Sequence, residues 1–391
     1  MRTCPVNDLK TGDVLAKTVY LPSNRLLLGA GFRIIDKVRQ TLIEKGFSHV
    51  YIMEEGIEDV IPEDVISEAI RYEAQLALEN NVNRIKRIKE FQEKTHEKVK
   101  VTLEQGNLED IEITAELKRT VLEVMQEISS SNVRFLSTIY PTSTDTAFYD
   151  HAVNTAVLSI VLGKRYRLPK NELYPLGLGA FLHDIGKIIL AQIADRIGET
   201  PADDYFREHP TFGYLLLRSD RSISPLVLQT VNQHHEQQDG NGFPIGLTGT
   251  NSPPVKDSSP QRGGIFRYAE ICAVANTYDR LLLSPANGTG ERRTPIDAMK
   301  EILMGADTVH NKHIVGKLAE TIPVYPVGSY LRINDIPDST LVGCYGVVAK
   351  INEKNLKCPA IIITTNKYNK KIKPIIIDTA KLSRIEMKLI F

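Results

Sequence analysis

One segment that looks buried carries three side chains that are costly to bury. The stretch LGAFLHDIGKIIL (178–190) is apolar except around His183, Asp184 and Lys187. An imidazole, a carboxylate and an ammonium each lose hydration on burial, so each needs a partner in the folded protein. Metal coordination supplies such partners, and an internal network of ion pairs is the plainer alternative.

The distribution of histidine helps to decide between these alternatives. A single histidine next to an apolar helical stretch is usually a core residue that is hydrogen-bonded to a backbone carbonyl. Several imidazoles beside a carboxylate instead favour a site for Fe, Mn, Zn or Ni, in which one carboxylate can bridge two divalent ions. Of the nine histidines, five fall next to such stretches between residues 151 and 235: His151, His183, His209, His234 and His235.

The order of these residues resembles a known family. HDIGK (183–187), followed by HP (209–210), HHE (234–236) and DGNGFPIGL (239–247), is similar to the HD-GYP subgroup of the HD superfamily of metal-dependent phosphohydrolases. Phe243 replaces the tyrosine of the subgroup name. The resemblance implies a binuclear site with two divalent ions, Fe or Mn first and Zn or Ni as alternatives. It also implies hydrolysis of cyclic di-GMP to a linear dinucleotide or to GMP in bacterial second-messenger signalling.

The resemblance also implies roles for individual residues. Asp184 would bridge the two ions and take part in catalysis. Lys187 lies one helical turn after His183, so it would face the site and contact a substrate phosphate. The implied metal ligands are His151, His183, Asp184, His209, His234, His235 and Asn276.

Three departures from the family pattern bear on activity. Ala147 stands where members with a third metal carry a glutamate, which indicates two ions at most. Asn276 stands where the family has a metal-binding aspartate, and its amide brings no charge to neutralise an ion. Arg292 and Arg293 either replace the family's basic run, which grips the phosphates of the substrate, or are solvated loop charges.

Two further functions remain open. The domain could sense a nucleotide, or bind a signalling protein partner, without turnover, because of Asn276 and the missing basic run. It could also hydrolyse another nucleotide, such as a mixed cyclic dinucleotide. The cyclic di-GMP phosphodiesterase is preferred, because the other ligands and Lys187 are all present and so many imidazoles would be costly to bury without metal.

Composition argues against nucleic acid and membrane as partners. Lys plus Arg (48) equals Asp plus Glu (48), so the 391-residue chain has no overall field that favours DNA or an anionic membrane. The start, MRTCPVNDLKTGD, lacks the apolar core of a signal peptide, and no later stretch approaches the run of about 20 apolar residues that spans a bilayer. The four cysteines show no CxxC spacing, which suits free thiols. We therefore expect a cytoplasmic protein.

The hydrophobic periodicity predicts a mainly α-helical chain, in which an all-helical HD-type domain is flanked by two small modules. Short apolar runs separated by turn residues predict an α+β module at the start, and the β-branched runs PAIIITT and IKPIIID predict a β-rich module at the end. The predicted divisions are residues 1–60 for the α+β module, 61–140 for a helical linker region, 141–325 for the HD-GYP-like domain and 326–391 for the β-rich module.

The linker region raises the question of self-association. Its apolar spacing predicts one amphipathic helix of about 40 residues, on the order of 60 Å long. Such a helix needs a cover for its apolar stripe, which is either a second copy of the chain in a homodimer or the core of the same chain. A second helix follows between residues 117 and 128. The stripe of the first helix consists of Leu78, Val82, Ile85, Ile88 and Phe91.

Overall fold

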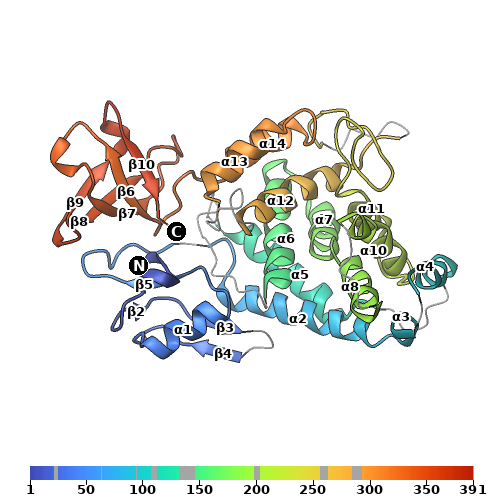
Figure 1. Ribbon diagram of the computed structural model, residues 1–391. Helices are drawn as coiled ribbons and strands as arrows, with labels where there is room; N and C mark the ends of the chain where they lie inside the picture. Colours follow the sequence, from blue (N-terminus) through green and yellow to red (C-terminus); the bar gives the residue numbers. More distant parts are fainter. Residues whose placement is uncertain are drawn as a thin grey trace.

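The two ends of the chain lie together beside a helical body (Figure 1). The backbone N–H of Thr3 donates to the carbonyl of Gly328 at 2.8 Å, and the N–H of Tyr330 donates to Oγ1 of Thr3 at 3.2 Å. The first and last modules therefore share an interface. The computed structural model describes residues 1–21, 25–62, 64–93, 95–106, 112–131, 146–197, 203–255, 263–283 and 293–390.

The N-terminal region combines a small sheet with one helix. Its three-stranded antiparallel sheet has the order β1-β5-β2, and β3 pairs with β4 in a separate hairpin. Leu42 of the helix packs with Leu15 and Val50 of the sheet in a local hydrophobic core. The elements are β1 (Arg2–Pro5), β2 (Val14–Leu15), β3 (Val19–Leu21), β4 (Arg25–Leu28), α1 (Asp36–Glu44) and β5 (His49–Met53).

The C-terminal module is a five-stranded antiparallel sheet with the order β10-β6-β7-β8-β9. Ile361 and Ile363 point to one face of β8 and are buried with Leu331 and Ile333 of β6, as expected for strands with one covered face. The predicted runs PAIIITT and IKPIIID correspond to two of these strands, β8 and β9. The strands are β6 (Tyr330–Asp335), β7 (Tyr345–Lys350), β8 (Ala360–Thr365), β9 (Lys371–Asp378) and β10 (Glu386–Leu389).

The prediction of one long helix between residues 62 and 100 is wrong. The chain forms three helices there, α2 (Glu68–Lys86), α3 (Lys89–Glu93) and α4 (His96–Gln105). The breaks between these helices keep Phe91 and the later apolar residues against the helical body. A single straight helix would run away from that body. The residues of the stripe pack into or against the core of this same chain, so no second copy is needed to cover them: Leu78, Val82, Ile85, Ile88 and Phe91.

The helical body is built around one continuous hydrophobic core, to which α2–α4 also contribute. α6 and α7 lie at its centre, and α2 runs along its base from the N-terminal module (Figure 1). The predicted second helix is α5, and its apolar face is buried. The remaining helices are α5 (Ala115–Ser130), α6 (Ala147–Arg165), α7 (Lys170–Leu182), α8 (Gly186–Ile197), α9 (Asp203–Phe206), α10 (His209–Leu217), α11 (Pro225–Gln233), α12 (Arg267–Leu283), α13 (Pro295–Met304) and α14 (Lys312–Ala319).

Capping side chains determine where several of these helices begin. The hydroxyl of Ser67 accepts the N–H of the third residue of α2, and Thr114 caps α5 in the same way. Ser224 and Thr294 cap α11 and α13, each of which has proline at its first position, and Asn311 caps α14. Such caps satisfy N–H groups that have no partner within the helix.

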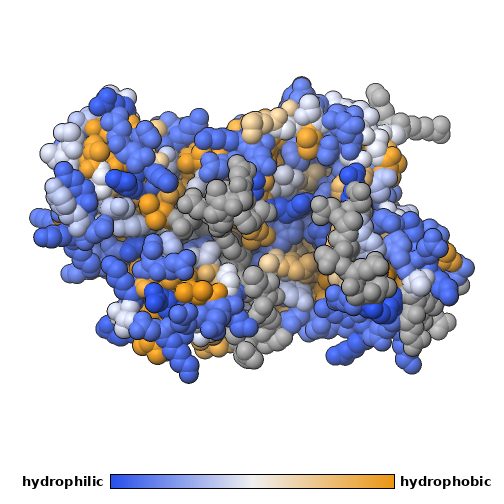
Figure 2. All heavy atoms as spheres, viewed as in Figure 1, coloured by the Kyte–Doolittle hydropathy of each residue, from blue (hydrophilic) through white to orange (hydrophobic). Residues whose placement is uncertain are grey.

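One stretch among the described residues, Lys170–Arg196, is long and apolar enough to cross a membrane by length and composition alone. Inside the protein, 83% of its apolar window is buried, as in the core helix of a globular fold. Figure 2 shows hydrophilic residues over most of the visible face, with hydrophobic residues in small separate patches.

Candidate metal centre

Ends and inner faces of several helices meet at one buried point in the helical body. His151 lies on α6, and His183 and Asp184 follow the last residue of α7. His209 is the first residue of α10, and His234 directly follows α11. All five of these side chains are buried. The structure thus brings together residues that lie up to 83 positions apart in the sequence, from 151 to 234.

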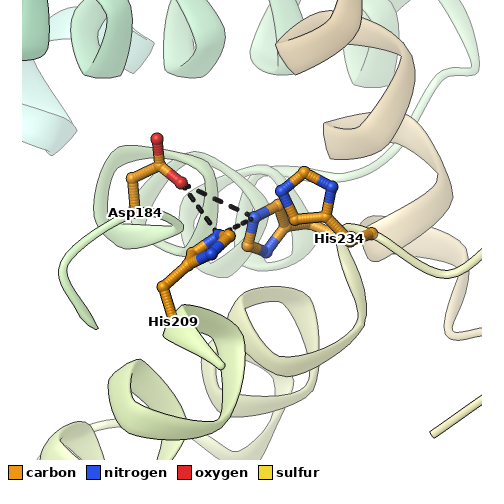
Figure 3. A group of neighbouring side chains, drawn as sticks. Asp184, His209 and His234 are labelled. Carbon is orange, nitrogen blue, oxygen red and sulfur yellow. Dashed lines mark hydrogen bonds and ion pairs between the residues drawn. The ribbon is translucent and has the colours of Figure 1, made fainter. Parts of the chain in front are cut away.

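Asp184 lies between two sets of imidazoles, one at each oxygen of its carboxylate. Oδ2 is 3.5 Å from Nε2 of His183 and 3.8 Å from Nε2 of His151. Oδ1 is 3.1 Å from Nε2 of His209 and 3.8 Å from Nε2 of His234 (Figure 3). A carboxylate in this position can serve two cations at once.

Two sets of potential ligand atoms share this carboxylate. We call the set formed by His151, His183 and Asp184 the first ion position, and the set formed by Asp184, His209, His234 and His235 the second ion position. Within each set, all ligand atoms lie within 4.8 Å of one another. This arrangement is compatible with a bridging Asp184, whose role as a metal ligand stays a prediction.

Backbone carbonyls hold three of the imidazoles with Nε2 pointing into the site. Nδ1 of His183 lies 2.7 Å from the carbonyl three residues earlier, and the corresponding distances are 2.6 Å for His209 and 2.7 Å for His234. A carbonyl can only accept a hydrogen bond, so Nδ1 carries the proton and Nε2 keeps its lone pair. Metal-binding histidines are commonly fixed in this way by a partner of the second nitrogen.

Several inward-facing atoms need a cation to satisfy them. Nε2 of His183 lies 3.2 Å from Nε2 of His151, and Nε2 of His209 lies 3.1 Å from Nε2 of His234. Facing lone pairs at such distances repel, and a shared cation relieves the repulsion. Among the described residues, three of the buried atoms that have no hydrogen-bond partner belong to this site: Nε2 of His235, Oδ1 of Asp184 and Oδ1 of Asn276. The nitrogen and oxygen atoms of these residues are therefore suited to bind divalent ions.

Asn276 and Asp279 reach the site from α12. Nδ1 of His151 lies 2.7 Å from Oδ2 of Asp279, and Asn276 is one helical turn before Asp279 on the same helix face. The side chain of Asn276 is 2% exposed. Its amide oxygen is buried without a hydrogen-bond partner, and metal binding by Asn276 stays a prediction.

Burial and neighbouring charge prepare these groups for metal binding at neutral pH. Burial lowers the pKa of His234 to about 4, and it lowers the pKa values of His183 and His235 well below the usual value. Burial alone would raise the pKa of Asp184, but electrostatic interactions with His183 and Lys187 hold that pKa well below its usual range. Neutral imidazoles and an ionised carboxylate are the forms that bind metal.

Lys187 occupies the position that the sequence predicts, beside the bridging carboxylate. Its Nζ lies 2.6 Å from Oδ2 of Asp184. The Lys187 side chain is 30% exposed, whereas that of Asp184 is 5% exposed. The ammonium therefore lies between the buried centre and the solvent, where a bound anion would meet it.

Two glycines allow backbones at the site to approach closely. A Cβ atom at Gly186 would lie 2.1 Å from the carbonyl oxygen of His209, so the start of α8 packs directly on the start of α10. This contact brings Asp184 next to His209. A Cβ atom at Gly242 would lie 2.3 Å from the backbone nitrogen of Gln237, so the loop after α11 also requires glycine.

The loop after α11 folds back over His235. The ring of Phe243 stacks on His235 with 4.5 Å between centroids and 13° between planes. The guanidinium of Arg207 lies 4.7 Å from the centroid of Phe243. The carboxylate of Glu236 accepts two backbone N–H groups of the loop, at 2.8 and 2.7 Å, and so holds it closed. Phe243 thus forms an aromatic wall beside the second ion position.

The structure describes only one of the two arginines that are predicted to bind substrate phosphate. Arg292 lies outside the described residues. Nε of Arg293 lies 3.1 Å from Oε2 of Glu301 on α13. Binding of substrate by either arginine stays a prediction.

A polar layer behind His151 was not predicted from the sequence. Asn154, one turn after His151 on α6, donates to Oδ1 of Asp279 at 2.9 Å and accepts from Arg71 of α2 at 2.6 Å. Asn154 lies three residues after His151, which places both on one helix face. This spacing is the signal in the sequence that could have indicated a role for Asn154 beside His151. Nothing in the local pattern pointed to Arg71, because α2 lies in another part of the sequence.

The helical body matches a known domain. The family model described as HD domain matches residues 148–312. This range contains all seven predicted metal ligands and Lys187. HD domains bind divalent metal ions, which agrees with the donor atoms gathered around Asp184.

Curated proteins are also similar to this chain. A protein named cyclic di-GMP phosphodiesterase from Pseudomonas aeruginosa is 27% identical over 252 residues, which cover 61% of this chain and 54% of the relative. Another of that name from Borreliella burgdorferi is 24% identical over 214 residues, covering 54% of this chain and 50% of the relative. The chain thus spans about half the length of these curated relatives.

A solved structure described as an HDG"Y"P protein from Bdellovibrio bacteriovorus is similar to this chain at 19% identity and a TM-score of 0.41. The similarity covers 81% of this chain and 97% of that one. The family match and the ordered HDIGK, HP and HHE motifs agree on one assignment. Residues 148–312 carry the sequence pattern of an HD domain.

Proposed function

We propose that this chain is a metal-dependent phosphodiesterase that hydrolyses cyclic di-GMP to a linear dinucleotide or to GMP. The observation that carries the proposal is the position of Asp184, whose two carboxylate oxygens face two separate sets of imidazole nitrogens. The names of the relatives from Pseudomonas aeruginosa and Borreliella burgdorferi support the choice of substrate.

In this proposal the chain's own residues prepare the site for two cations. The imidazoles and Asp184 bind them as the sequence predicts, with Asn276 as a neutral ligand from α12. Two divalent ions, Fe or Mn first, would activate a water molecule and stabilise charge on the phosphoryl oxygens. Lys187 contacts a phosphate oxygen from the solvent side and adds to that stabilisation. The loop that carries Phe243 shields one side of the site from water.

A nucleotide sensor without turnover is the second candidate, and Asn276 is the observation that favours it. Among the described residues of the two ion positions, Asp184 is the anionic ligand, so two divalent ions would leave a large positive excess. A charged substrate could supply the missing neutralisation, or the weaker ion could be absent and the domain could only bind.

An anaerobic reconstitution separates these candidates. The full chain is loaded with Fe(II) or Mn(II) and supplied with cyclic di-GMP, and the products are separated by chromatography. The enzyme is expected to release linear dinucleotide or GMP in a metal-dependent manner, and Asp184→Asn should abolish release. The control is His310→Gln, because His310 is buried outside both ion positions. Binding of cyclic di-GMP without product would support the sensor instead.

The remaining predictions belong to the same proposal. We infer a cytoplasmic protein in which the modules at residues 1–60 and 326–391 receive signals for the domain at residues 141–325. The region at 61–140 connects them. A homodimer and signalling protein partners are compatible with this arrangement, and sedimentation of the purified chain would test the dimer.

A further inference from the structure

A chain of hydrogen bonds runs from α2 to the candidate ligand His151. Nδ1 of His151 lies 2.7 Å from Oδ2 of Asp279, and Oδ1 of Asp279 accepts from Nδ2 of Asn154 at 2.9 Å. The amide oxygen of Asn154 then accepts from Nη1 of Arg71 at 2.6 Å. These contacts connect three helices, α6, α12 and α2, whose residues are more than 80 positions apart in the sequence.

Arg71 is an unusual residue to find in this place. It lies on α2 among the apolar residues that cover the helical body, and it is 8% exposed. Burying a guanidinium is costly, and the carboxylates of Asp64, Asp150 and Asp279 offset part of that cost. Replacing a buried ion pair by well-packed apolar residues is often neutral or stabilising, so the burial of Arg71 is weak evidence for a role in stability alone.

His151 also differs from its neighbours in how its ring is held. In His183, His209 and His234, Nδ1 donates to a carbonyl within its own helix or turn, which moves only with the backbone. In His151, Nδ1 donates to a side chain, Asp279. The orientation of this ring therefore depends on whatever holds the Asp279 carboxylate in place.

We propose that Arg71 is a positioning residue for His151 and thereby for the first ion position. The planar guanidinium orients the amide of Asn154, the amide fixes the carboxylate of Asp279, and the carboxylate fixes the ring orientation and tautomer of His151. This inference rests on the proposed metal centre. It extends that centre to α2, a helix outside the match to the HD domain at residues 148–312.

The same helix contacts the N-terminal module. Nζ of Lys17 lies 3.5 Å from Oε1 of Glu68, the first residue of α2, and Arg71 is one turn further along. A shift of α2 by that module would therefore reach His151 through two intervening side chains. The inference needs only the positioning role of Arg71, which can be tested in the full chain.

A positioning role and a general stabilising role predict different metal binding. If Arg71 acts through Asn154 and Asp279, its loss weakens only the ion bound at the first position, because the rings of His209 and His234 are held by carbonyls. If Arg71 only stabilises the fold, its loss affects both ions equally or neither. Counting ions and measuring their separate affinities distinguishes the two roles without any measurement of turnover.

The test uses the full chain freed of metal and titrated with Co(II), whose visible absorption reports ligand geometry. The variants are Arg71→Met, Arg71→Lys and Asn154→Ala. The matched control is Asn81→Ala, since Asn81 is a buried polar residue of the same helix that donates to the carbonyl of Ala77 at 2.7 Å and to Thr114 at 2.8 Å. Melting temperatures show how far each substitution destabilises the fold.

We expect Arg71→Met to keep one Co(II) at wild-type affinity and to bind the other roughly tenfold more weakly, with a changed spectrum, as for partners of metal-ligating histidines. Arg71→Lys should recover only part of the affinity, because an ammonium lacks the planar fork. Combining Arg71→Met with Asn154→Ala should add little to either single effect. Asn81→Ala should lower the melting temperature and bind both ions as the wild type does.

Two results would overturn the inference. One is wild-type affinity at both positions in Arg71→Met, and the other is equal weakening of both ions in Arg71→Met. If Arg71→Met does not fold, the affinities of the two ion positions are compared in Arg71→Lys and Asn154→Ala instead. Failure of the wild-type chain to bind Co(II) would instead refute the proposed metal centre, so the two failures are distinguishable.

Discussion

Nζ of Lys187 lies 2.6 Å from Oδ2 of Asp184, the same oxygen that faces His151 and His183. A cation at the first ion position would therefore share this oxygen with an ammonium. An ion bound there would repel the ammonium from Oδ2, and the partly exposed Lys187 would then be available to a phosphate of the substrate. The pair would thus connect occupancy of the site to capture of substrate.

Lys187→Gln should lower kcat for cyclic di-GMP by roughly a hundredfold, in the range found when one donor to a developing negative charge is removed. It should leave the metal content unchanged, because the amide competes less well than the ammonium for the oxygen of Asp184. Steady-state kinetics and metal analysis of the same preparation check both points. Loss of metal together with activity would contradict the role given to Lys187.

Asn276→Asp should strengthen binding of the weaker ion roughly tenfold or more, because it adds a negative charge to a site with few anionic ligands. Isothermal titration of the metal-free protein with Mn(II) measures this affinity. A parallel rise in turnover would identify the wild type as a weakened enzyme. Tighter metal binding with no turnover of cyclic di-GMP would favour the sensor.

The metal-free protein should lose stability as the pH falls below 6.5. Burial lowers the pKa of His234 to about 4 from 6.5, and lowers those of His183 and His235 as well. The unfolded chain therefore takes up protons between pH 6.5 and 4 that the folded chain does not, which favours unfolding. Thermal melts across this range check the sign, and added Mn(II) should raise the melting temperature most at neutral pH.

Gly186→Ala should destabilise the protein by about 1 to 3 kcal/mol, because the new methyl group would overlap the backbone of α10 at His209. The shift of α10 should also weaken binding at the second ion position. Gly316→Ala is the matched control, since no heavy atom lies within 4 Å of a Cβ at that helical position. The control should be neutral or stabilise by up to about 1 kcal/mol, as judged by chemical denaturation.

The prediction of one long helix failed because tertiary packing, which the sequence pattern does not show, determines where that helix is broken. The apolar stripe of Leu78, Val82 and Phe91 marked helical residues correctly, but its period could not show that the chain bends to keep Phe91 against the body. Nor could that period tell a dimer surface from a core surface, because both require the same residue types. α2 packs against α5, α6 and α8, α3 against α8 and α4 against α10, and only the folded chain presents these different partners.

The sequence by itself determined which side chains could bind metal and in which domain, because imidazole and carboxylate chemistry resides in residue types and the HDIGK, HP and HHE motifs are local. Only the tertiary structure decided how these side chains divide into two sets around Asp184 and which groups hold them. Asp279 meets His151 from 128 positions away, and Arg71 meets Asn154 from 83 positions away. Contacts between such distant segments depend on helix packing and leave no periodic signal in the sequence.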